Sequence, residues 1–475
     1  MRMLLLLSLS LIILQPETVV AQKKGETLLV VTKDADISVE GKVLKTLHEG
    51  YEVVFKDISA PWYWVEHKGT LGWINSTTAR TIPEAIEFYT SQINANPSSS
   101  NYRYRGDAYL LQKKYQSALN DLDEAVRLDS GSAKNFDSRA SIHSKLGNRK
   151  QMYADINMAI QLDPTSATRY NNRGVLYASD SKPDKAIADY TQSIRLNPKK
   201  AIYFKNRGMS YKKKDDFKSA IKDFDSAVKL LPAYSSAIAE RGDCQLELKN
   251  YEAALQDYQA ALKIDPASTD ALWGMALYFD IKKDPQQANQ YYENVLKLDP
   301  KRYFAYYKIG SNFQSENNFA KAIQNYDRSI AIKPTYRSAH RNRGICYRKT
   351  GNYAQALKDF DQAIQISPKH PDAYRSRAWL KITASDPKFI DLAGAKQDLA
   401  QAEKFTSPGS WRLAQSFAGL YAAEGKFDQA VETMNKAIAL QQEHTTLSEA
   451  ARQQARDYLA LYQQKKPYRE IPLKP

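Results

Sequence analysis

Apolar and small residues recur along most of the chain with a period of 34 residues. One series of small residues begins at Gly106, and a second begins twelve positions later at Ala118. The first series continues through Ala140, Gly174, Gly208, Gly242, Ala276, Gly310, Gly344 and Ala378. The second continues through Met152, Ala186, Ala220, Ala254, Ala288, Ala322 and Ala356. A fixed period of this length predicts stacked supersecondary units rather than one compact core.

Each unit predicts two helices joined by a short turn. In a typical unit the first helix carries Tyr177 three positions after its glycine, and the second carries Tyr190 four positions after its alanine. These spacings place large and small residues together on one buried helical face. Pro198 then closes the unit, and most other units have a proline at the equivalent position.

This pattern resembles the tetratricopeptide repeat (TPR) over roughly 345 residues. The resemblance implies a mainly α fold, a right-handed TPR α-solenoid of about ten helix-turn-helix repeats over residues 99–444. Residues 82–98 predict a connecting helix that corresponds to half a repeat. Residues 445–475 predict a C-terminal capping helix and tail, with the helix continuing to Glu470.

An arginine and an aspartate recur together in seven of the units. The arginine directly precedes the small residue, and the aspartate follows sixteen positions later, or twenty-one in the ninth unit, which is five residues longer. In the other units both are replaced, by Met275 with Tyr291, Ile309 with Asn325, and Phe417 with Thr433. We predict a structural, non-catalytic bridge between the two helices of each unit, formed by Arg105–Asp121, Arg139–Asp155, Arg173–Asp189, Arg207–Asp223, Arg241–Asp257, Arg343–Asp359 and Arg377–Asp398.

Residues 22–81 have a different pattern. Short β-rich runs separated by turn signals predict five strands and a small β-barrel. The closing G-W-I run and the W-x-W-V strand before it resemble bacterial SH3-like domains. Alternation along a strand puts Trp62 and Trp64 on one face and Tyr63 on the other. Either Trp64 and Trp73 belong to the core, or Trp62 and Tyr63 form a surface site for a peptide or glycan.

The first 21 residues predict a secretory signal peptide that is cleaved near Ala21. Arg2 precedes an apolar run from Leu4 to Leu14, and small residues follow before Gln22. The apolar run is shorter than the roughly 20 residues that a membrane-spanning helix needs. An uncleaved signal anchor is the competing interpretation. We expect a secreted or periplasmic protein with no transmembrane segment after cleavage. The motifs E-G-K-F-D-Q-A and L-x-L-Y-x-x-x-K-P-Y-R-E also resemble secreted bacterial proteins that join an SH3-like domain to a TPR array.

Composition and motifs argue against an enzymatic activity. The formal net charge of +15 favours acidic partners, although a basic protein with no nucleic-acid role is also compatible with it, and we expect no nucleic acid partner. We find no phosphate-binding glycine loop, zinc spacing or nucleophile elbow in the sequence. We expect no enzyme activity, no cofactor and no metal site. Cys244 and Cys346 stand three units apart and are predicted not to form a disulfide.

The resemblance implies that the first helices line a concave groove. Its positions lie three residues before the small residue, one after it, and four to five after it. The predicted partner-binding residues are Arg103, Asn171, Lys205, Lys212, Lys213, Trp273, Tyr307, Arg341, Arg348, Lys349 and Arg375. This set predicts a basic surface in the middle and late repeats, with an aromatic patch at Trp273 and Tyr307.

We interpret the chain as a protein–protein interaction scaffold that binds an acidic or extended partner segment in this groove. A solvated face without a ligand is the alternative for the groove. A cell-envelope or peptidoglycan-associated protein that binds glycan through the SH3-like domain is the alternative function. Because the pattern is broken at Met275, at Ile309 and in the longer ninth unit, we expect a site near these positions.

Overall fold

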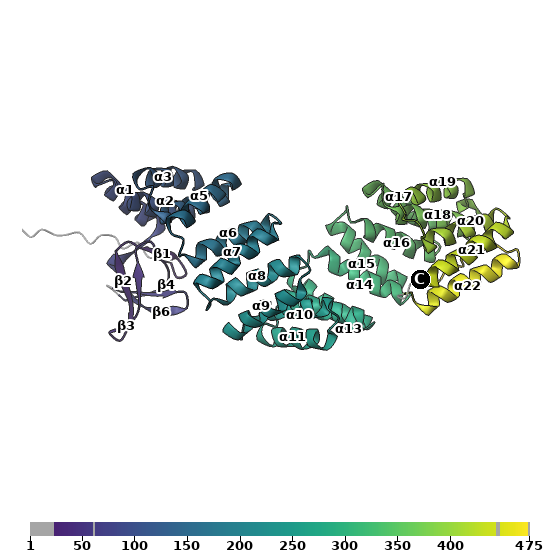
Figure 1. Cartoon of the computed structure of the whole chain (residues 1–475), viewed down its shortest axis with the longest axis horizontal. Helices are drawn as coiled ribbons and strands as arrows, with labels where there is room; N and C mark the ends of the chain where they lie inside the picture. Colours follow the sequence, from purple (N-terminus) through teal and green to yellow (C-terminus); the bar gives the residue numbers. More distant parts are fainter. Residues whose placement is uncertain (1–22, 60–61, 443–446, 474–475) are drawn as a thin grey trace, which may run out of the picture. The chain divides into compact units, whose positions relative to one another are not determined.

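The structure is a computed structural model that describes residues 23–59, 62–442 and 447–473 (Figure 1). It falls into two compact units, Met1–Ser210 and Tyr211–Pro475, and the division lies within α8 (Ala201–Lys213). The predicted signal peptide, residues 1–21, lies outside the described residues. Among the helices that are described, none has the length and apolar character needed to cross a membrane.

The first unit begins with an antiparallel sheet of seven described strands, where the sequence predicts five. The strands are β1 (Thr27–Val30), β2 (Asp34–Val39), β3 (Lys42–His48), β4 (Glu52–Ser59), β5 (Trp62–His67), β6 (Thr70–Asn75) and β7 (Ala79–Thr81). Their order across the sheet is β3-β2-β6-β5-β4-β1-β7. The extra pairing comes from β1, which binds both β4 and β7. The likeness of this sheet to an SH3-like barrel stays a prediction.

The aromatic residues of β5 lie on opposite sides of the strand, but the surface prediction for Tyr63 is wrong. Tyr63 is 7% exposed and packs in the core of the sheet with Phe55, at 5.4 Å between ring centroids. Trp62 is 41% exposed. Trp64 and Trp73 are half-buried and contact each other on the face opposite Tyr63, with ring centroids 5.0 Å apart. Alternation therefore holds, and the inner face is the one that carries Tyr63.

The helix α1 (Ile82–Ala95) joins the sheet to the repeats through a shared core. It starts at a capping box in which Thr81 and Glu84 bond each other's backbone N–H groups. Ala85 and Tyr89 of α1 are buried together with Leu29 of β1 and Ala108 of the next helix. The remaining complete helices of this unit are α2 (Ser99–Leu111), α3 (Tyr115–Leu128), α4 (Ala133–Leu146), α5 (Arg149–Leu162), α6 (Ala167–Ser179) and α7 (Pro183–Leu196).

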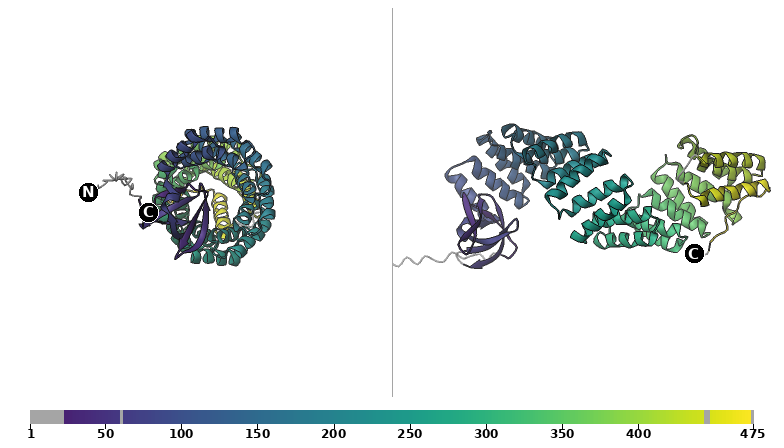
Figure 2. Two further views of the ribbon diagram at one scale, coloured as in Figure 1. Left: turned by 90° about the vertical axis from the view of Figure 1, so that its left-hand side faces the viewer. Right: turned by 60° about the horizontal axis from the view of Figure 1, so that its bottom comes forward.

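The second unit continues the alternation of first and second helices (Figures 1 and 2). Its helices are α9 (Phe217–Leu230), α10 (Ser235–Glu247), α11 (Tyr251–Ile264), α12 (Thr269–Ile281), α13 (Pro285–Leu298), α14 (Tyr303–Ser315), α15 (Phe319–Ile332), α16 (Arg337–Lys349), α17 (Tyr353–Ile366), α18 (Pro371–Thr383), α19 (Leu392–Lys404), α20 (Trp411–Ala423), α21 (Phe427–Gln442) and α22 (Glu449–Gln463). The five extra residues of the ninth unit hold a short 3-10 helix, η2 (Pro387–Phe389), between α18 and α19. Described in this way, the chain is a mainly helical TPR-type solenoid that follows an antiparallel sheet.

An aromatic ring of the second helix approaches the first helix so closely that the first helix needs a small residue at the contact. A Cβ atom at Gly174 would lie 2.7 Å from Cε1 of Tyr190, and one at Gly344 would lie 2.8 Å from Cε1 of Phe360. Both aromatic side chains are almost fully buried. Glycine therefore lets the two helices pack around a large ring without a clash.

The predicted arginine–aspartate bridges are confirmed for six of the seven pairs. In each one Nε and Nη2 of the arginine donate to the two oxygens of one carboxylate. The six pairs are Arg105–Asp121, Arg139–Asp155, Arg173–Asp189, Arg241–Asp257, Arg343–Asp359 and Arg377–Asp398. Arg207 and Asp223 belong to different units, so the prediction for this pair stays a prediction.

The same arginines make a third hydrogen bond that the sequence analysis did not predict. Nη1 donates to a side chain on the second helix of the preceding repeat, sixteen positions earlier in most cases. Examples are Arg139 to Asp123 at 2.9 Å, Arg173 to Asn157 at 2.8 Å, Arg241 to Asp225 at 2.6 Å and Arg343 to Asp327 at 2.6 Å. Each of these guanidinium groups therefore holds one first helix to two second helices.

Two repeats of the second unit occupy the same position with apolar side chains. Met275 and Ile309 are both buried, and Tyr291 stacks on Phe279 with ring centroids 5.6 Å apart. The interior at this position accepts either a fully paired charge or an apolar contact, because an unpaired charge there would be costly. The joint presence or absence of arginine and aspartate follows from this requirement.

Removal of one bridge partner should destabilise the second unit more than removal of both. Arg241→Met leaves the Asp257 carboxylate nearly buried without its partner, so we expect the free energy of unfolding to fall by about 2–4 kcal/mol. The double variant Arg241→Met/Asp257→Tyr copies the Met275 and Tyr291 pair and should recover at least half of the loss. Urea unfolding followed by circular dichroism measures both, and a double variant no more stable than the single one contradicts the account.

The two cysteines are free and buried, as predicted, and they provide a probe of the second unit. Burial raises the pKa of Cys244 and of Cys346 to about 12. Very little thiolate exists at pH 8, and the folded chain shields both sulfur atoms. We expect iodoacetamide to modify neither cysteine in the native protein and both in urea, as measured by mass spectrometry. Rapid modification of either thiol under native conditions would contradict the packing described.

Candidate functional site

Four of the predicted cations gather on two neighbouring first helices. Arg341, Arg348 and Lys349 lie on α16, and Arg375 lies on α18. We call these four residues the basic cluster. Arg348, Lys349 and Arg375 line one cavity of about 200 Å³. The period explains the convergence, because Arg341 and Arg375 are 34 positions apart and occupy equivalent places in adjacent repeats.

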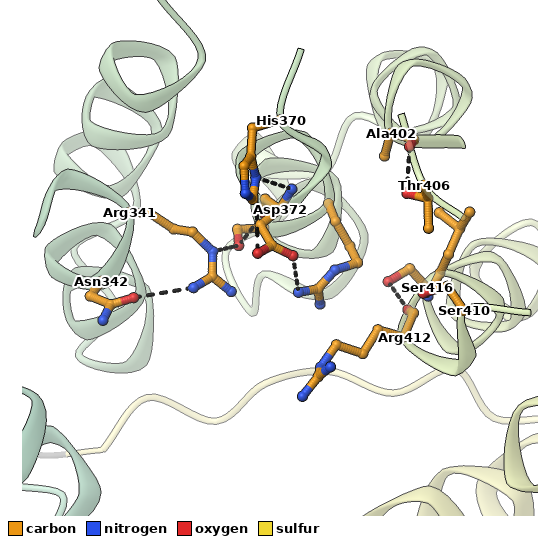
Figure 3. Close-up of polar contacts among 12 residues, drawn as sticks. Arg341, Asn342, His370, Asp372, Ala402, Thr406, Ser410, Arg412 and Ser416 are labelled. Atoms are coloured by element: carbon orange, nitrogen blue, oxygen red, sulfur yellow. Dashed lines mark hydrogen bonds and ion pairs between the residues drawn. The ribbon is translucent and has the colours of Figure 1, made fainter. Parts of the chain in front are cut away.

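Arg341 and Arg375 both lie near the carboxylate of Asp372. Nη2 of Arg375 lies 3.1 Å from Oδ1 of Asp372, whereas Arg341 donates to neutral acceptors. Its Nε donates to the hydroxyl of Ser376 at 3.2 Å and its Nη1 to Oδ1 of Asn342 at 3.2 Å (Figure 3). In the same view Arg412 extends from α20 toward the terminal segment of the chain, drawn in pale yellow.

The pKa values reflect a shortage of negative charge at this place. Burial and the like charge of Arg375 lower the pKa of Arg341 to about 10. Burial also lowers the pKa of Arg375, an effect that Asp372 opposes. For Asp372 itself, burial acts against ionisation, but Arg341 and Arg375 outweigh it and lower its pKa. At neutral pH both arginines are charged, and they would be stabilised by a further anion.

The other carboxylate at the basic cluster comes from the end of the chain. Glu470 is 2% exposed, forms an ion pair with Nη1 of Arg348, and lies 2.8 Å from Nζ of Lys349. The sequence analysis missed this residue because it expected a helix as far as Glu470. Instead, α22 ends at Gln463, where Lys465 adopts a positive φ of 57° and Pro467 follows. Proline disfavours a helical residue before it, so the chain leaves the helix and continues in an extended form.

The predicted aromatic patch is one continuous group. Trp273 of α12 lies 5.7 Å from Phe304, which stacks on Tyr307 at 5.6 Å, and Tyr307 meets Tyr336 at 5.1 Å between ring centroids. All four side chains are half-buried. The hydroxyl of Tyr307 accepts a hydrogen bond from Asn342, which also bonds Arg341. The aromatic group therefore reaches the edge of the basic cluster.

Of the two predicted groove lysines at the end of α8, one is neutralised by acidic side chains and the other is exposed. Nζ of Lys212 lies 2.7 Å from Glu240 and 2.6 Å from Asp243, so the prediction that this position makes the middle repeats basic is wrong. The acidic partners come from α10, the next first helix, and a pattern limited to selected positions overlooked them. Lys213 is exposed to solvent.

The groove residues predicted in the first unit make contacts within that unit. Arg103 forms an ion pair with Asp107 at 3.6 Å, and its guanidinium lies over the ring of Tyr104. Asn171 accepts a hydrogen bond from Asn206 at 3.0 Å, and Lys205 is half-buried. Among the described residues of the first unit, these contacts bring no predicted groove cations together.

Two further cavities lie elsewhere in the described structure. One, of about 440 Å³, lies on the sheet and is lined by Trp62 and Trp73 together with Ser38, Glu40, Gly41 and Ser59. The other, of about 720 Å³, lies between the starts of α18 and α20 and includes His370, Ser410 and Trp411. Over the described part of the chain, no group of three or more His, Cys, Asp or Glu side chains is placed to hold a metal ion.

Comparison with known families identifies the repeated unit. Family models described as tetratricopeptide repeat match residues 167–200, 205–269, 309–381 and 413–444. No curated protein sequence matches the chain.

Several solved structures are similar to parts of this chain. A TPR protein from Parabacteroides merdae shares 19% identity over 55% of this chain and 98% of its own, with a TM-score of 0.43. Yeast Tom70 shares 15% sequence identity over 81% of this chain and 92% of its own, with a TM-score of 0.38. YrrB, described as a TPR protein with an unusual peptide-binding site, shares 21% sequence identity over 40% of this chain and 97% of its own. Its TM-score is 0.34.

Proposed function

Because this chain is a tetratricopeptide-repeat protein, a family of protein–protein interaction scaffolds, we propose that its late repeats bind an extended, acidic segment of a partner protein. The observation that carries the proposal is the basic cluster. Four cations meet two carboxylates, Asp372 and Glu470, at a half-buried surface of α16 and α18. A partner carboxylate supplies the missing charge, and the adjacent aromatic group offers apolar contacts to the same segment.

We also propose that the protein acts outside the cytoplasm, as a secreted or periplasmic protein. The apolar run and small residues within the first 21 positions support this proposal. Its partners are then proteins of the cell envelope or the exterior.

A second candidate function is supported by the cavity on the sheet. Trp62 is exposed and lines a cavity of about 440 Å³ with Trp73 and several polar groups. Aromatic faces next to hydroxyl and carboxylate groups suit a glycan, whose rings present both apolar faces and polar edges. Through this cavity the sheet would hold the cell wall while the repeats hold a protein.

Reversal of charge at the basic cluster should abolish partner capture. The variant Arg341→Glu/Arg375→Glu turns two attractive groups into repulsive ones. We expect it to lose at least about 90% of the acidic proteins that the wild-type chain captures from an envelope extract at low salt, since each full charge reversal costs several kcal/mol. Quantitative mass spectrometry of the captured proteins measures this loss.

The matched control for that experiment is Lys229→Glu/Lys263→Glu. It changes the net charge equally but at exposed, equivalent positions of the second helices α9 and α11. We expect this control to retain the captured proteins. Unchanged capture by the Arg341→Glu/Arg375→Glu variant, with circular dichroism like the wild type, would reject the proposed site.

The glycan proposal makes an independent prediction for Trp62. We expect Trp62→Ala to lower co-sedimentation of the chain with purified peptidoglycan at least about tenfold, because stacking on an aromatic face provides much of such binding. Leu71→Ala, at another exposed apolar residue of the sheet, should leave co-sedimentation unchanged. No binding by the wild-type chain, or equal binding by both variants, would reject this function.

A further inference from the structure

The terminal segment Tyr468–Leu473 lies on α16 and α18 in an extended conformation. The chain leaves α22 at Gln463 and returns along these two first helices (Figures 2 and 3). The N–H of Glu470 donates to the carbonyl of Thr383, and the N–H of Leu473 donates to the carbonyl of Lys349, both at 2.8 Å. The segment therefore binds the repeats through its backbone as well as its side chains.

The two acceptor carbonyls are equivalent positions of adjacent repeats. Lys349 is the last residue of α16 and Thr383 is the last residue of α18, and they are 34 positions apart. The last carbonyls of a helix have no partner within the helix, so they are available to a ligand. Each first helix in the array ends with such a group.

The spacing of the donors matches the spacing of the repeats. Glu470 and Leu473 are three residues apart, and three residues of an extended polyproline-type chain span about 9 Å. Packed helices lie about 8–10 Å apart. Pro467 and Pro472 favour this extended form, and a polyproline-type chain with three residues per turn places donors three residues apart on one side. The segment thus advances one repeat for every three residues.

Three side chains anchor the segment, and one of them is Arg469, whose Nη1 donates to the carbonyl of Ile382 at 2.7 Å. Glu470 is buried against Arg348 and Lys349 of the basic cluster. Tyr468 packs against Tyr458 of α22 at 4.6 Å and stacks on Trp379 of α18 at 6.1 Å between ring centroids. A buried carboxylate requires such charged partners, so the position of Glu470 selects for an acidic side chain.

Apart from these anchors, the apolar side chains of the segment remain largely exposed. Ile471 is 81% exposed and Leu473 is 46% exposed. Beside Glu470, the cavity shared with Arg348, Lys349 and Arg375 leaves about 200 Å³ open. The segment is therefore held mainly by two backbone hydrogen bonds and the side chains of Tyr468, Arg469 and Glu470, with little buried apolar surface to stabilise it in place.

We propose that α16 and α18 form a binding site for an extended peptide with an aromatic residue two positions before a glutamate, and that the chain's own terminal segment occupies this site until such a peptide displaces it. The site rests on the proposed function and deepens it by naming the partner segment: an aromatic side chain against Trp379, a glutamate on Arg348 and Lys349, and backbone N–H groups three residues apart. A partner must compete with a tethered segment, so the tail sets a threshold for binding.

The test uses a fluorescein-labelled peptide of residues 466–473 and the full chain. In the wild-type chain the tethered segment competes at an effective concentration of about millimolar, so the probe should bind weakly. In the variant Tyr468→Ala/Glu470→Gln the tethered segment loses two of its three side-chain anchors and keeps Arg469, while the site on α16 and α18 remains. We expect the probe to bind this variant about tenfold or more tightly than the wild type in fluorescence anisotropy.

Two controls separate site occupancy from other effects. Ile471→Ala changes an exposed residue of the segment and should bind the probe as weakly as the wild type does. A probe that carries the Glu470→Gln change should bind the Tyr468→Ala/Glu470→Gln chain at least about tenfold less tightly than the original probe. Circular dichroism of both chain variants checks that the helices are intact.

Equal affinity of the probe for the wild type and for the Tyr468→Ala/Glu470→Gln variant would overturn the proposal, and so would a failure to bind that variant at all. Probe binding that follows the expected pattern supports the site. If the probe binds in this way but the Arg341→Glu/Arg375→Glu variant captures partners as well as the wild type does, the proposed function is rejected and the peptide site is retained. The two proposals therefore fail by different results.

Discussion

The structure depends on one contact that recurs in the repeats, the arginine that joins a first helix to the second helices on either side of it. Two of its nitrogens bind the aspartate of its own repeat, and a third binds the preceding repeat, as Arg241 does with Asp257 and Asp225. The carboxylate is nearly buried, so its charge must be paired. In a repeat protein that is stabilised by contacts between neighbours, such a three-helix bond fixes the spacing of successive units.

The regular spacing also arranges those residues of the first helices that lie outside the bridge. Positions outside the bridge are free to vary, and in α16 and α18 they carry the basic cluster. The helix ends repeat at the same spacing and offer carbonyls such as those of Lys349 and Thr383 at regular intervals. An extended chain can follow these carbonyls while its side chains meet the cations. The same regularity that stabilises the array therefore also positions the carbonyls and cations that bind the terminal segment.

The sequence analysis succeeded for contacts that recur with the 34-residue period and failed for contacts that follow no repeated pattern. The period, the six bridges, and the four members of the basic cluster follow from equivalent positions 34 residues apart. Lys212 is neutralised by Glu240 and Asp243. These two residues belong to no repeated series, so the period does not predict the contact. One of two alternatives placed Tyr63 on the surface, because alternation identifies two faces but not the buried one.

The role of Glu470 was the least accessible from the sequence. It pairs with Arg348 across 122 positions in the chain, and no period connects the two residues. The only signals were Pro467 and Pro472, which favour an extended segment after the last helix. The expectation of a site near the breaks in the pattern stays a prediction.

Residue-resolved amide hydrogen exchange of the full chain tests the central claim most directly. If the terminal segment occupies α16 and α18, the amides of Glu470 and Leu473 exchange at least about tenfold more slowly than that of Ile471, because only the first two are hydrogen-bonded to the array among the described residues. Exchange of all three amides at the rate of a free peptide would contradict the account.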